Sequence, residues 1–348
     1  MLHPLVRSVA LAVRTLVPAA LAALLLSGLA RAQETTLEGV MARGALRCGV
    51  NPDLEGFSIR NGGSWSGFDV DYCRAIAAAV LGDGNKVVFV PLTTKERFSA
   101  LQDGDIDVLI RDTGWTMARD TTFGLTFAAI NFYNGYGFLV PLGLGVTSAL
   151  QLSGALICVE PGSIAEKAVA QFFTKQDMTY RAVFEASPDG QRSRYEAGDC
   201  NVIVGDIATL PAMRQQLRQP DQSVVLDDTV GKDPFGPVVR DGDPRWAAIV
   251  RWVHFALLNA EEFGVTADTV DSQANSPVED IRNLLGLEGT FGQGLGLRGD
   301  WAAEAIRAVG NYGEIFERNL GSGSRLKMRR GLNALWTDGG LQFAPPIR

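Results

Sequence analysis

Apolar and polar positions follow one another along the chain in a pattern that predicts two similar α/β units. The first unit is predicted to contain short buried strands separated by helices, with strands at 45–50, 86–91 and 107–110 and helices at 68–81 and 96–102. The second unit repeats this order, with strands at 156–159, 180–184 and 202–204 and helices at 162–173, 192–197 and 207–216. Such alternation predicts a mostly parallel sheet covered by helices in each unit.

The chain leaves the second unit at about Asp233. A long amphipathic helix is predicted over 246–260, and the remainder to Arg348 is rich in helices and loops. No Pro/Gly/Ser-rich linker separates this remainder from the rest. Because ligands of open α/β sheets bind beyond the carboxyl ends of the strands, we expect the functional site in a cleft between two lobes.

The first 32 residues resemble a secretory signal peptide. Arg7 and Arg14 precede an apolar run over 16–29, and Ala30-Arg31-Ala32 places small residues where a signal peptidase reads them. We expect cleavage after Ala32 and export to the periplasm. The alternative is an uncleaved membrane anchor, which the short apolar run disfavours because a spanning helix needs about 20 residues.

Removing these 32 residues from the 348 leaves 316, enough for two domains. The leader carries three arginines and no acid, so the formal net charge falls from −7 to −10. An acidic chain without a basic run argues against nucleic-acid binding, which depends on clustered Lys and Arg. It does not exclude a small zwitterionic ligand.

The cysteines predict disulfides. An even count in an exported chain favours pairing, and three pairings of Cys48, Cys73, Cys158 and Cys200 exist. We favour Cys48–Cys73 and Cys158–Cys200, because each would close a loop within one lobe. The mature chain has a single histidine, His254, in a strongly helical stretch, where we expect a structural role. The spacing of cysteine and histidine predicts neither a metal nor a cofactor, and no catalytic triad can be assembled.

Three segments at strand ends carry the groups that an α-amino acid requires. The first, 110–120, contains Arg119, and the second, 159–163, places Gly162 and Ser163 before a helix start, where free N–H groups bind carboxylates. The third ends in Asp206, an anion that can receive an ammonium. Each feature has a plainer alternative: Arg119 and Asp206 as surface ion-pair residues, and Gly162-Ser163 as a helix cap.

The chain resembles the periplasmic binding proteins of general L-amino-acid ABC transporters, within the type II, two-lobed class. The similar segments cover nearly the whole mature chain: 67–73, Trp115-Thr116 with Arg119-Asp120, 259–264 and 310–319. The resemblance implies a signal peptide (1–32), lobe 1 (33–138), lobe 2 (139–234), and a return to lobe 1 with a helical C-terminal extension (235–348). It also implies a monomer that delivers amino acids to permease subunits by closing its lobes around them.

The resemblance assigns a role to each candidate ligand-binding residue. Arg119 would hold the ligand carboxylate, Ser163 with Gly162 would face it from the other lobe, and Asp206 would receive the ammonium. The segment Asp112-Thr113-Gly114 would complete the cradle. Phe57 falls near the position of a residue that covers the ligand side chain, and a core phenylalanine is the alternative.

The cradle departs from the pattern of the family at three positions. Gly114 lacks a hydroxyl that relatives supply, while Asp112 and Glu160 each add an acid. Losing one charge-assisted hydrogen bond costs roughly 1.5–3 kcal/mol. We therefore expect specificity to shift away from glutamate and aspartate, unless Asp112 turns outward to solvent. A periplasmic dehydratase-like enzyme of the same fold and a ligand-sensing partner of a receptor are the alternative functions.

Overall fold

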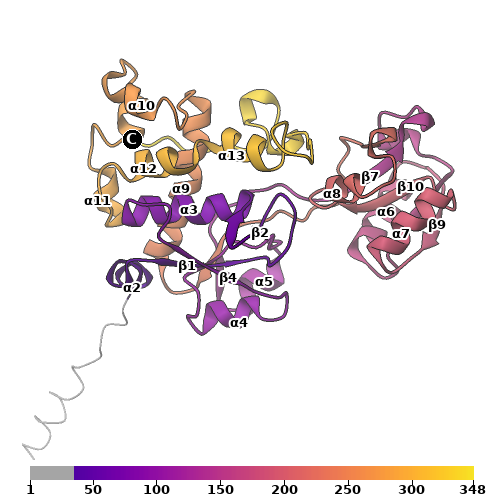
Figure 1. The fold of residues 1–348 in the computed structure, drawn as a ribbon, viewed down its shortest axis with the longest axis horizontal. Helices are drawn as coiled ribbons and strands as arrows, with labels where there is room; N and C mark the ends of the chain where they lie inside the picture. Colours follow the sequence, from indigo (N-terminus) through magenta and orange to yellow (C-terminus); the bar gives the residue numbers. More distant parts are fainter. Residues whose placement is uncertain (1–34) are drawn as a thin grey trace, which may run out of the picture. The chain divides into compact units, whose positions relative to one another are not determined.

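The computed structural model describes residues 35–348 (Figure 1). The predicted leader and its cleavage site at Ala32 lie outside these residues. Two mixed five-stranded sheets organise the chain, and the small hairpin β2 (Ile59–Asn61) and β3 (Ser64–Ser66) stands apart from both. Among residues 35–348, no helix combines the length and the apolarity that crossing a membrane requires.

The first sheet has the order β4-β1-β5-β12-β6. Its strands are β1 (Leu46–Val50), β4 (Val87–Pro91), β5 (Val108–Leu109), β6 (Leu125–Phe127) and β12 (Val238–Arg240). Strand β1 pairs in parallel with β4 and β5, whereas β12 runs antiparallel to β5 and β6. The sheet is therefore completed by a strand that lies more than 100 residues after its neighbours in the chain.

The second sheet has the order β11-β7-β10-β8-β9 and the same construction. Its strands are β7 (Tyr136–Pro141), β8 (Ala155–Val159), β9 (Tyr180–Phe184), β10 (Val202–Asp206) and β11 (Ser223–Val225). Strands β8, β9 and β10 are parallel, and β7 runs antiparallel to β10 and β11. The prediction of mostly parallel sheets is confirmed: in each sheet four of the five strands point the same way, and one strand next to a crossover, β12 or β7, runs against them.

Helices cover both sheets and fill the C-terminal part of the chain. Before the second sheet they are α2 (Thr36–Arg43), α3 (Phe68–Leu81), α4 (Arg97–Gln102) and α5 (Met117–Thr122). Those of the second sheet are α6 (Ile164–Lys175), α7 (Pro188–Ala197) and α8 (Leu210–Gln215), with the short 3₁₀ turns η1 (Leu142–Leu144), η2 (Ala149–Gln151) and η3 (Pro220–Gln222). After β12 come α9 (Pro244–Glu262), η4 (Val270–Asn275), α10 (Glu279–Leu284), α11 (Phe291–Leu295), α12 (Trp301–Val309), α13 (Tyr312–Asn319), η5 (Gly331–Asn333) and η6 (Trp336–Asp338).

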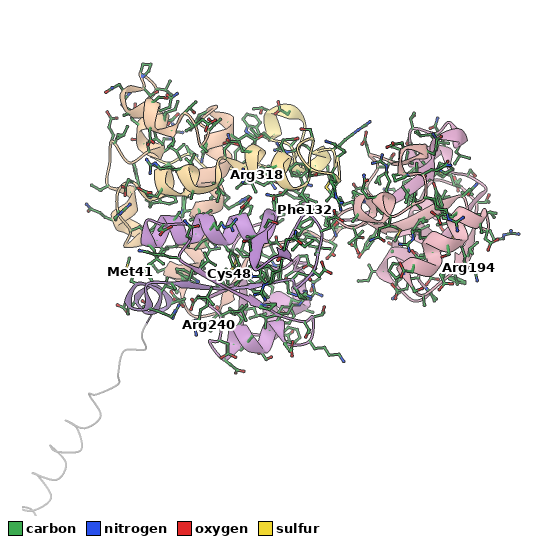
Figure 2. The ribbon with its side chains drawn as sticks, viewed as in Figure 1. Met41, Cys48, Phe132, Arg194, Arg240 and Arg318 are labelled. Carbon is green, nitrogen blue, oxygen red and sulfur yellow. A yellow bond between two sulfur atoms is a disulfide. The ribbon has the colours of Figure 1, made fainter. Side chains whose placement is uncertain are left out.

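Each sheet has its own hydrophobic core. Helices α3, α9, α12 and α13 pack one face of the first sheet into the largest cluster, which contains Cys48 and Phe132 (Figure 2). A smaller cluster around Leu101 and Phe127 covers the other face. In the second sheet, α6 packs on one face around Phe138 and Phe173, and the other face carries a separate cluster. The predicted α/β fold with a helical C-terminal extension is confirmed.

The predicted disulfides are confirmed. Cys48 on β1 is bonded to Cys73 on α3, and Cys158 on β8 is bonded to Cys200, two residues before the start of β10. Each bridge therefore ties a strand of one sheet to a neighbouring element of the same unit. Because disulfides persist in oxidising compartments, the pairing agrees with the expectation that the protein is exported.

Two crossover segments, 128–135 and 226–237, connect the sheets and run antiparallel to one another. Tyr136 and Val230 exchange two backbone hydrogen bonds, and the backbone N–H of Phe235 donates to the carbonyl of Phe132 at 2.8 Å. The C-terminal extension joins them, because the side chain of Asn333 accepts from the backbone N–H of Tyr133 at 2.6 Å. The crossovers are thus held together by hydrogen bonds between elements distant in sequence.

Candidate functional site

Arg119 lies in α5, next to the carboxyl end of β5. Thr116 caps this short helix by accepting from the Arg119 backbone N–H at 3.3 Å, which fixes where the side chain begins. The guanidinium donates from Nη1 to the carbonyl of Gly114 at 2.7 Å and lies 5.9 Å from the ring centre of Phe98. One edge of the guanidinium is thereby positioned, and Arg119 remains half-buried.

Asp206 is the last residue of β10 in the second sheet. Its carboxylate accepts from the Asn134 side chain at 3.0 Å. Burial raises the pKa of Asp206, the bond from Asn134 opposes this, and the charges of Asp233 and Asp112 raise the pKa further. Asp112 belongs to the first sheet, so charges carried by the two sheets lie within electrostatic reach of each other.

Tyr136, at the start of β7, is influenced by charges from both sheets. Its pKa is raised to about 12, mainly by burial and then by the carboxylates of Asp233 and Asp206, while the guanidinium of Arg119 opposes the rise. One phenol therefore senses both Arg119 and Asp206. The charges of Arg119 and Asp206, which the sequence singled out, therefore both act on the pKa of this phenol.

Asp112 is paired inside the protein. Its carboxylate accepts from the Asn51 side chain at 3.0 Å and lies 3.8 Å from Arg111. Its backbone N–H donates to the buried carboxylate of Asp69, and its φ of 40° places it in the left-handed region. Burial raises the pKa of Asp112, while Asn51 and Arg111 oppose the rise. Asp112 therefore neither turns outward nor stands as a free negative charge.

Thr113 and Gly114 contribute differently to the first cradle. The side chain of Thr113 is completely buried and donates to the carbonyl of Arg111 at 2.9 Å, so it is engaged by the protein. Gly114 pairs with Phe235 of the second crossover. A Cβ at position 114 would lie 2.1 Å from Oδ1 of Asp233 and 3.0 Å from Nη1 of Arg119. The missing side chain thus leaves the space in which the carboxylate of Asp233 approaches the guanidinium of Arg119.

The segment Glu160–Ser163 forms its own helix cap. Ser163 accepts from the backbone N–H of Glu166 at 3.1 Å and donates to the carbonyl of Glu160 at 2.8 Å. The backbone N–H of Gly162 donates to the side chain of Glu166 at 2.5 Å. Glu160 is exposed to solvent. In this conformation the helix cap is formed, and a ligand carboxylate would have to replace the one that Glu166 supplies.

Phe57 is a core residue. Its side chain has no exposed surface and packs edge-on against Phe68, Phe132 and Phe235, with ring centres 5.1–6.3 Å apart. The first of the two roles considered for it, covering a ligand, needs surface that this side chain does not have. The prediction failed because an aromatic residue after a strand has the same sequence signal in a core as in a binding site.

His254 is also structural. It is buried in α9, where its Nδ1 lies 2.9 Å from the hydroxyl of Tyr72, and burial lowers its pKa to about 3. The imidazole is therefore neutral at physiological pH and far from the titration range of a general base. Within residues 35–348, no group of three or more His, Cys, Asp or Glu side chains is arranged to hold a metal ion.

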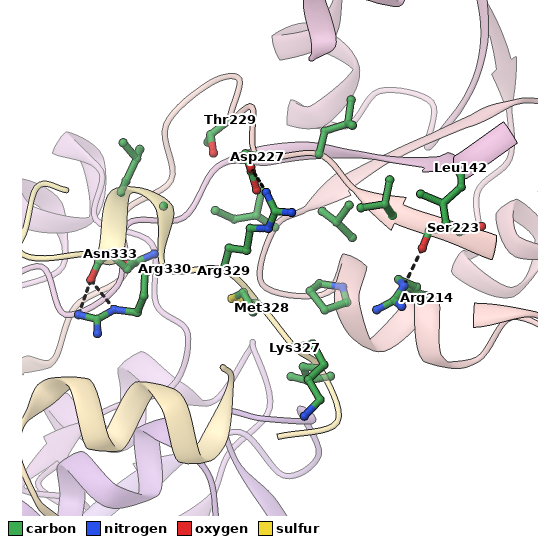
Figure 3. A pocket seen from close by; sticks show the side chains of 18 of the residues that line it. Leu142, Arg214, Ser223, Asp227, Thr229, Lys327, Met328, Arg329, Arg330 and Asn333 are labelled. Carbon is green, nitrogen blue, oxygen red and sulfur yellow. Dashed lines mark hydrogen bonds and ion pairs between the residues drawn. The ribbon is translucent and has the colours of Figure 1, made fainter. Parts of the chain in front are cut away.

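A separate cavity of about 300 Å³ lies between the second sheet and the C-terminal extension (Figure 3). Arg214 bonds to the carbonyl of Ser223 on one side of it, and Arg329 pairs with Asp227 across it. Its lining does not include Arg119 or Asp206. The candidate amino-acid site is therefore defined by converging charges and not by this cavity.

Residues 46–263 match the bacterial extracellular solute-binding proteins, family 3. The chain belongs to this family. It is 50% identical to the general L-amino acid-binding periplasmic protein AapJ of Rhizobium johnstonii, over 94% of this chain and 97% of that protein. It is 47% identical to the glutamate/glutamine/aspartate/asparagine-binding protein BztA of Rhodobacter capsulatus, over 91% and 94% of the two chains.

A solved structure supports the same family assignment. The periplasmic binding protein of an ABC transporter from Brucella ovis, solved with glutathione bound, is 51% identical, with a TM-score of 0.77 over 90% of this chain and 99% of that one. The family resemblance stated from the sequence is confirmed. These relatives are binding proteins, and the two curated relatives named above share nearly the full length of the chain.

The sequence did not point to three residues that lie at the candidate site. Asp233 and Asn134 lie on the crossovers, where no strand end marks them, and Arg97 lies at the start of α4. Arg97 carried a usable signal, since a cation in the first turn of a helix opposes the helix dipole and calls for an explanation. Asp233 could have been found only from its contact with Gly114.

Proposed function

We propose that this protein captures a ligand bearing an α-amino-acid head group and delivers it to the permease subunits of an ABC transporter. Arg119 would bind the ligand carboxylate, and Asp206 would receive the ammonium. The observation that carries the proposal is a chain of contacts between the two groups. Asp233 and Arg119 both border the space that a Cβ on Gly114 would fill, the backbone N–H of Asp233 donates to the carbonyl of Asn134 at 3.0 Å, and the Asn134 side chain donates to Asp206 at 3.0 Å. A zwitterion placed there would meet a group of opposite charge at each end.

Closure around the ligand follows from the position of the crossovers. The two segments 128–135 and 226–237 are the connections between the sheets. Arg119 precedes the first connection, and Asp206 lies between the two. A ligand that contacts both groups binds a closed form better than an open one, and so shifts the population toward the closed form. We propose that 33–138 with 235–348 forms one lobe, that 139–234 forms the other, and that Ser163 and Gly162 reach the ligand on closure.

The ligand class is supported by what relatives bind. The name of AapJ specifies L-amino acids, the name of BztA specifies glutamate, glutamine, aspartate and asparagine, and the Brucella ovis structure holds glutathione. All these molecules carry a free α-amino and α-carboxylate pair on one carbon. The group that the protein recognises in every ligand would then be this head group. The ligand side chain would be contacted elsewhere in the site.

Export and a binding role without catalysis complete the proposal. The leader sequence 1–32 would be cleaved after Ala32 to release the protein into the periplasm, the compartment in which its relatives work. We infer no enzymatic activity, because the relatives are binding proteins and the buried His254 stays neutral. Incubation with bound ligands, followed by product analysis, tests this inference directly.

A thermal-shift screen of the twenty L-amino acids and glutathione, using the mature chain from Gln33, tests the function. A ligand that binds only the folded state raises the melting temperature. At a concentration of a hundred times its Kd, it adds about 2.7 kcal/mol to the free energy of unfolding. We expect shifts with several amino acids in the wild-type protein and much smaller shifts in Arg119→Gln at the same ligand concentrations. An absence of any shift in the wild-type protein would contradict the proposed function.

A further inference from the structure

The segment 325–333 of the C-terminal extension, here called the strap, is anchored on the elements that cover the first sheet. Leu326 is buried, and a Cβ on Gly56 would lie 2.5 Å from its Cδ1, so the leucine packs directly on the backbone of this glycine. Further along the strap, the guanidinium of Arg330 donates to both carboxylate oxygens of Glu261 in α9, at 2.9 and 3.1 Å. The strap lies beyond the residues that match the solute-binding family, so the family fold alone does not explain it.

The strap also contacts the elements of the second sheet, at two exposed points. Nε2 of Gln215, in α8, donates to the carbonyl of Arg325 at 2.8 Å. The guanidinium of Arg329 pairs with the carboxylate of Asp227, two residues after the end of β11, and both side chains are more than half exposed. The cavity of Figure 3 is lined by the strap and by β11, so close packing does not join them there. Polar contacts that water can replace therefore connect the strap to the second sheet.

These two contacts link parts of the chain that move relative to one another in the proposed closure. Asp227 moves with the second sheet, because its neighbour Asp228 accepts from the hydroxyl of Ser148 at 2.9 Å. Gln215 moves with the same sheet, whereas the strap is fixed to the first. Hydrogen-bond distances vary over only roughly half an ångström. A rotation about the crossovers therefore cannot preserve both contacts, because they are attached at separate points.

Two exposed apolar side chains mark the present conformation as the open one. Met117, the first residue of α5, is 83% exposed, and Ile164, the first residue of α6, is 67% exposed. Arg119 and Ser163 are their near neighbours in the chain. A ligand that contacts both Arg119 and Ser163 would draw the starts of the two helices together and cover these side chains. The contacts of the strap are therefore contacts of the open form.

We propose that the strap holds the two lobes open and thereby sets the affinity for the ligand. This inference rests on the proposed function, because it requires that the lobes close around a ligand. Interactions made only in the open form lower the apparent affinity, since the ligand must shift the population toward the closed form. An exposed ion pair such as Arg329–Asp227 changes an equilibrium about 1.5- to fivefold. The strap thus adjusts the affinity moderately and does not abolish closure.

Distances between the lobes in the ligand-free protein test the strap without any ligand. The four native cysteines form disulfides, so Thr122→Cys on α5 and Lys167→Cys on α6 provide two exposed sites for spin labels. Pulsed electron resonance then measures the distance between the labels, which shortens as α5 and α6 approach. We expect Arg329→Gln and Asp227→Asn each to increase the short-distance population about two- to fivefold. An unchanged distribution in both variants, or a shift to longer distances, overturns the proposal.

Isothermal titration with L-glutamine, without labels, measures the same equilibrium through binding. We expect each single variant to bind L-glutamine about two- to fivefold more tightly than the wild-type protein. The reversed pair, Arg329→Asp with Asp227→Arg, should return the affinity and the distances to within about twofold of the wild-type values, because it restores the attraction. Tighter binding with unaltered distances would assign the effect to the binding site itself and also overturn the proposal.

The control separates the strap from exposed ion pairs in general. Arg218→Gln removes an exposed guanidinium whose partner, Glu196 at 3.3 Å, lies in the same proposed lobe. It should change neither the distances nor the affinity, and a change as large as that in Arg329→Gln would refute a specific role of the strap. Wild-type protein that binds no amino acid in the thermal-shift screen contradicts the proposed function instead. The ligand-free distances then still decide whether the strap holds the lobes apart.

Discussion

The two sheets contribute to the site in different ways. The first sheet supplies a dense set of charges on α4, α5 and the loop after β5, and most of them are held by neighbours before any ligand arrives: Arg111, Asp112 and Arg119. The second sheet supplies Asp206 and a helix cap whose donors are already used by Glu166 and Glu160. In the candidate site, the first half therefore presents charges that neighbours hold in position, and the helix cap of the second half has its donors engaged in internal hydrogen bonds.

This difference indicates an order of events. A ligand can meet Arg119 with little rearrangement, because the guanidinium is positioned by Gly114 and Phe98. The second half must exchange internal hydrogen bonds for ligand bonds, which gains little net free energy per bond. Most of the initial affinity should then come from the first sheet. Ligand contacts with the second sheet would mainly stabilise the closed form.

The largest expected effect is on the stability of the two halves. The disulfides close loops with sequence separations of 25 and 42 residues, and the chain-entropy relation gives about 3.5 and about 4 kcal/mol for their stabilisation. Replacing Cys158 and Cys200 by Ala should therefore destabilise the second sheet at least as much as replacing Cys48 and Cys73 destabilises the first. Urea unfolding followed by circular dichroism measures both. If both double variants lose little free energy of unfolding, the disulfides do not stabilise the two cores.

The next effect separates the ligand-binding roles of the halves. Arg119→Gln and Asp206→Asn each remove one partner of a charge pair with the ligand, which costs about 2–5 kcal/mol. We expect at least a thirtyfold loss of affinity in each by isothermal titration, with little change in unfolding free energy. Asp189→Asn, an exposed acid on α7, is the matched control. A near-normal affinity in either variant would remove that residue from the site.

A smaller effect concerns Gly114, where the first sheet meets the second crossover. Gly114→Ser would place a Cβ 2.1 Å from Asp233, so the acid must move from Arg119. We expect an affinity loss of about 1–2 kcal/mol from the displaced charges, since over-packing costs about that much. Combining it with Asp233→Ala should recover most of the loss. A double-mutant cycle without coupling would show that the two residues act independently.

The sequence predicted those parts of the molecule that depend on local pattern. The helix at 68–81 and the strand at 180–184 have the predicted bounds. Apolar periodicity and the flanking Gly67 and Gly82 define the helix. The disulfides followed from the same lobe assignment. Strands β7 and β12 and the contact of Asp233 were not predictable, since they depend on chain crossings that bring together residues far apart in the sequence, such as Leu139 with Ile203 and Leu109 with Val238. Arg97 was missed because the feature that marks it, a buried Nε without a hydrogen-bond partner among residues 35–348, is one that only packing reveals.

The smallest effect is the pH dependence, and it has opposite signs for folding and for binding. Burial raises the pKa of Asp69, Asp112, Asp206 and Asp233 in the folded protein. The folded state then binds more protons than the unfolded state, so these groups favour folding as pH falls toward their raised pKa and disfavour it above. Binding of the ligand ammonium needs ionised Asp206, so affinity should fall by up to tenfold per pH unit below that pKa. Titrations between pH 7 and 4.5 measure the affinity, and melting of the ligand-free protein measures the stability. In Asp206→Asn the decline in affinity should be smaller than in the wild-type protein, and an unchanged decline would assign it to another acid.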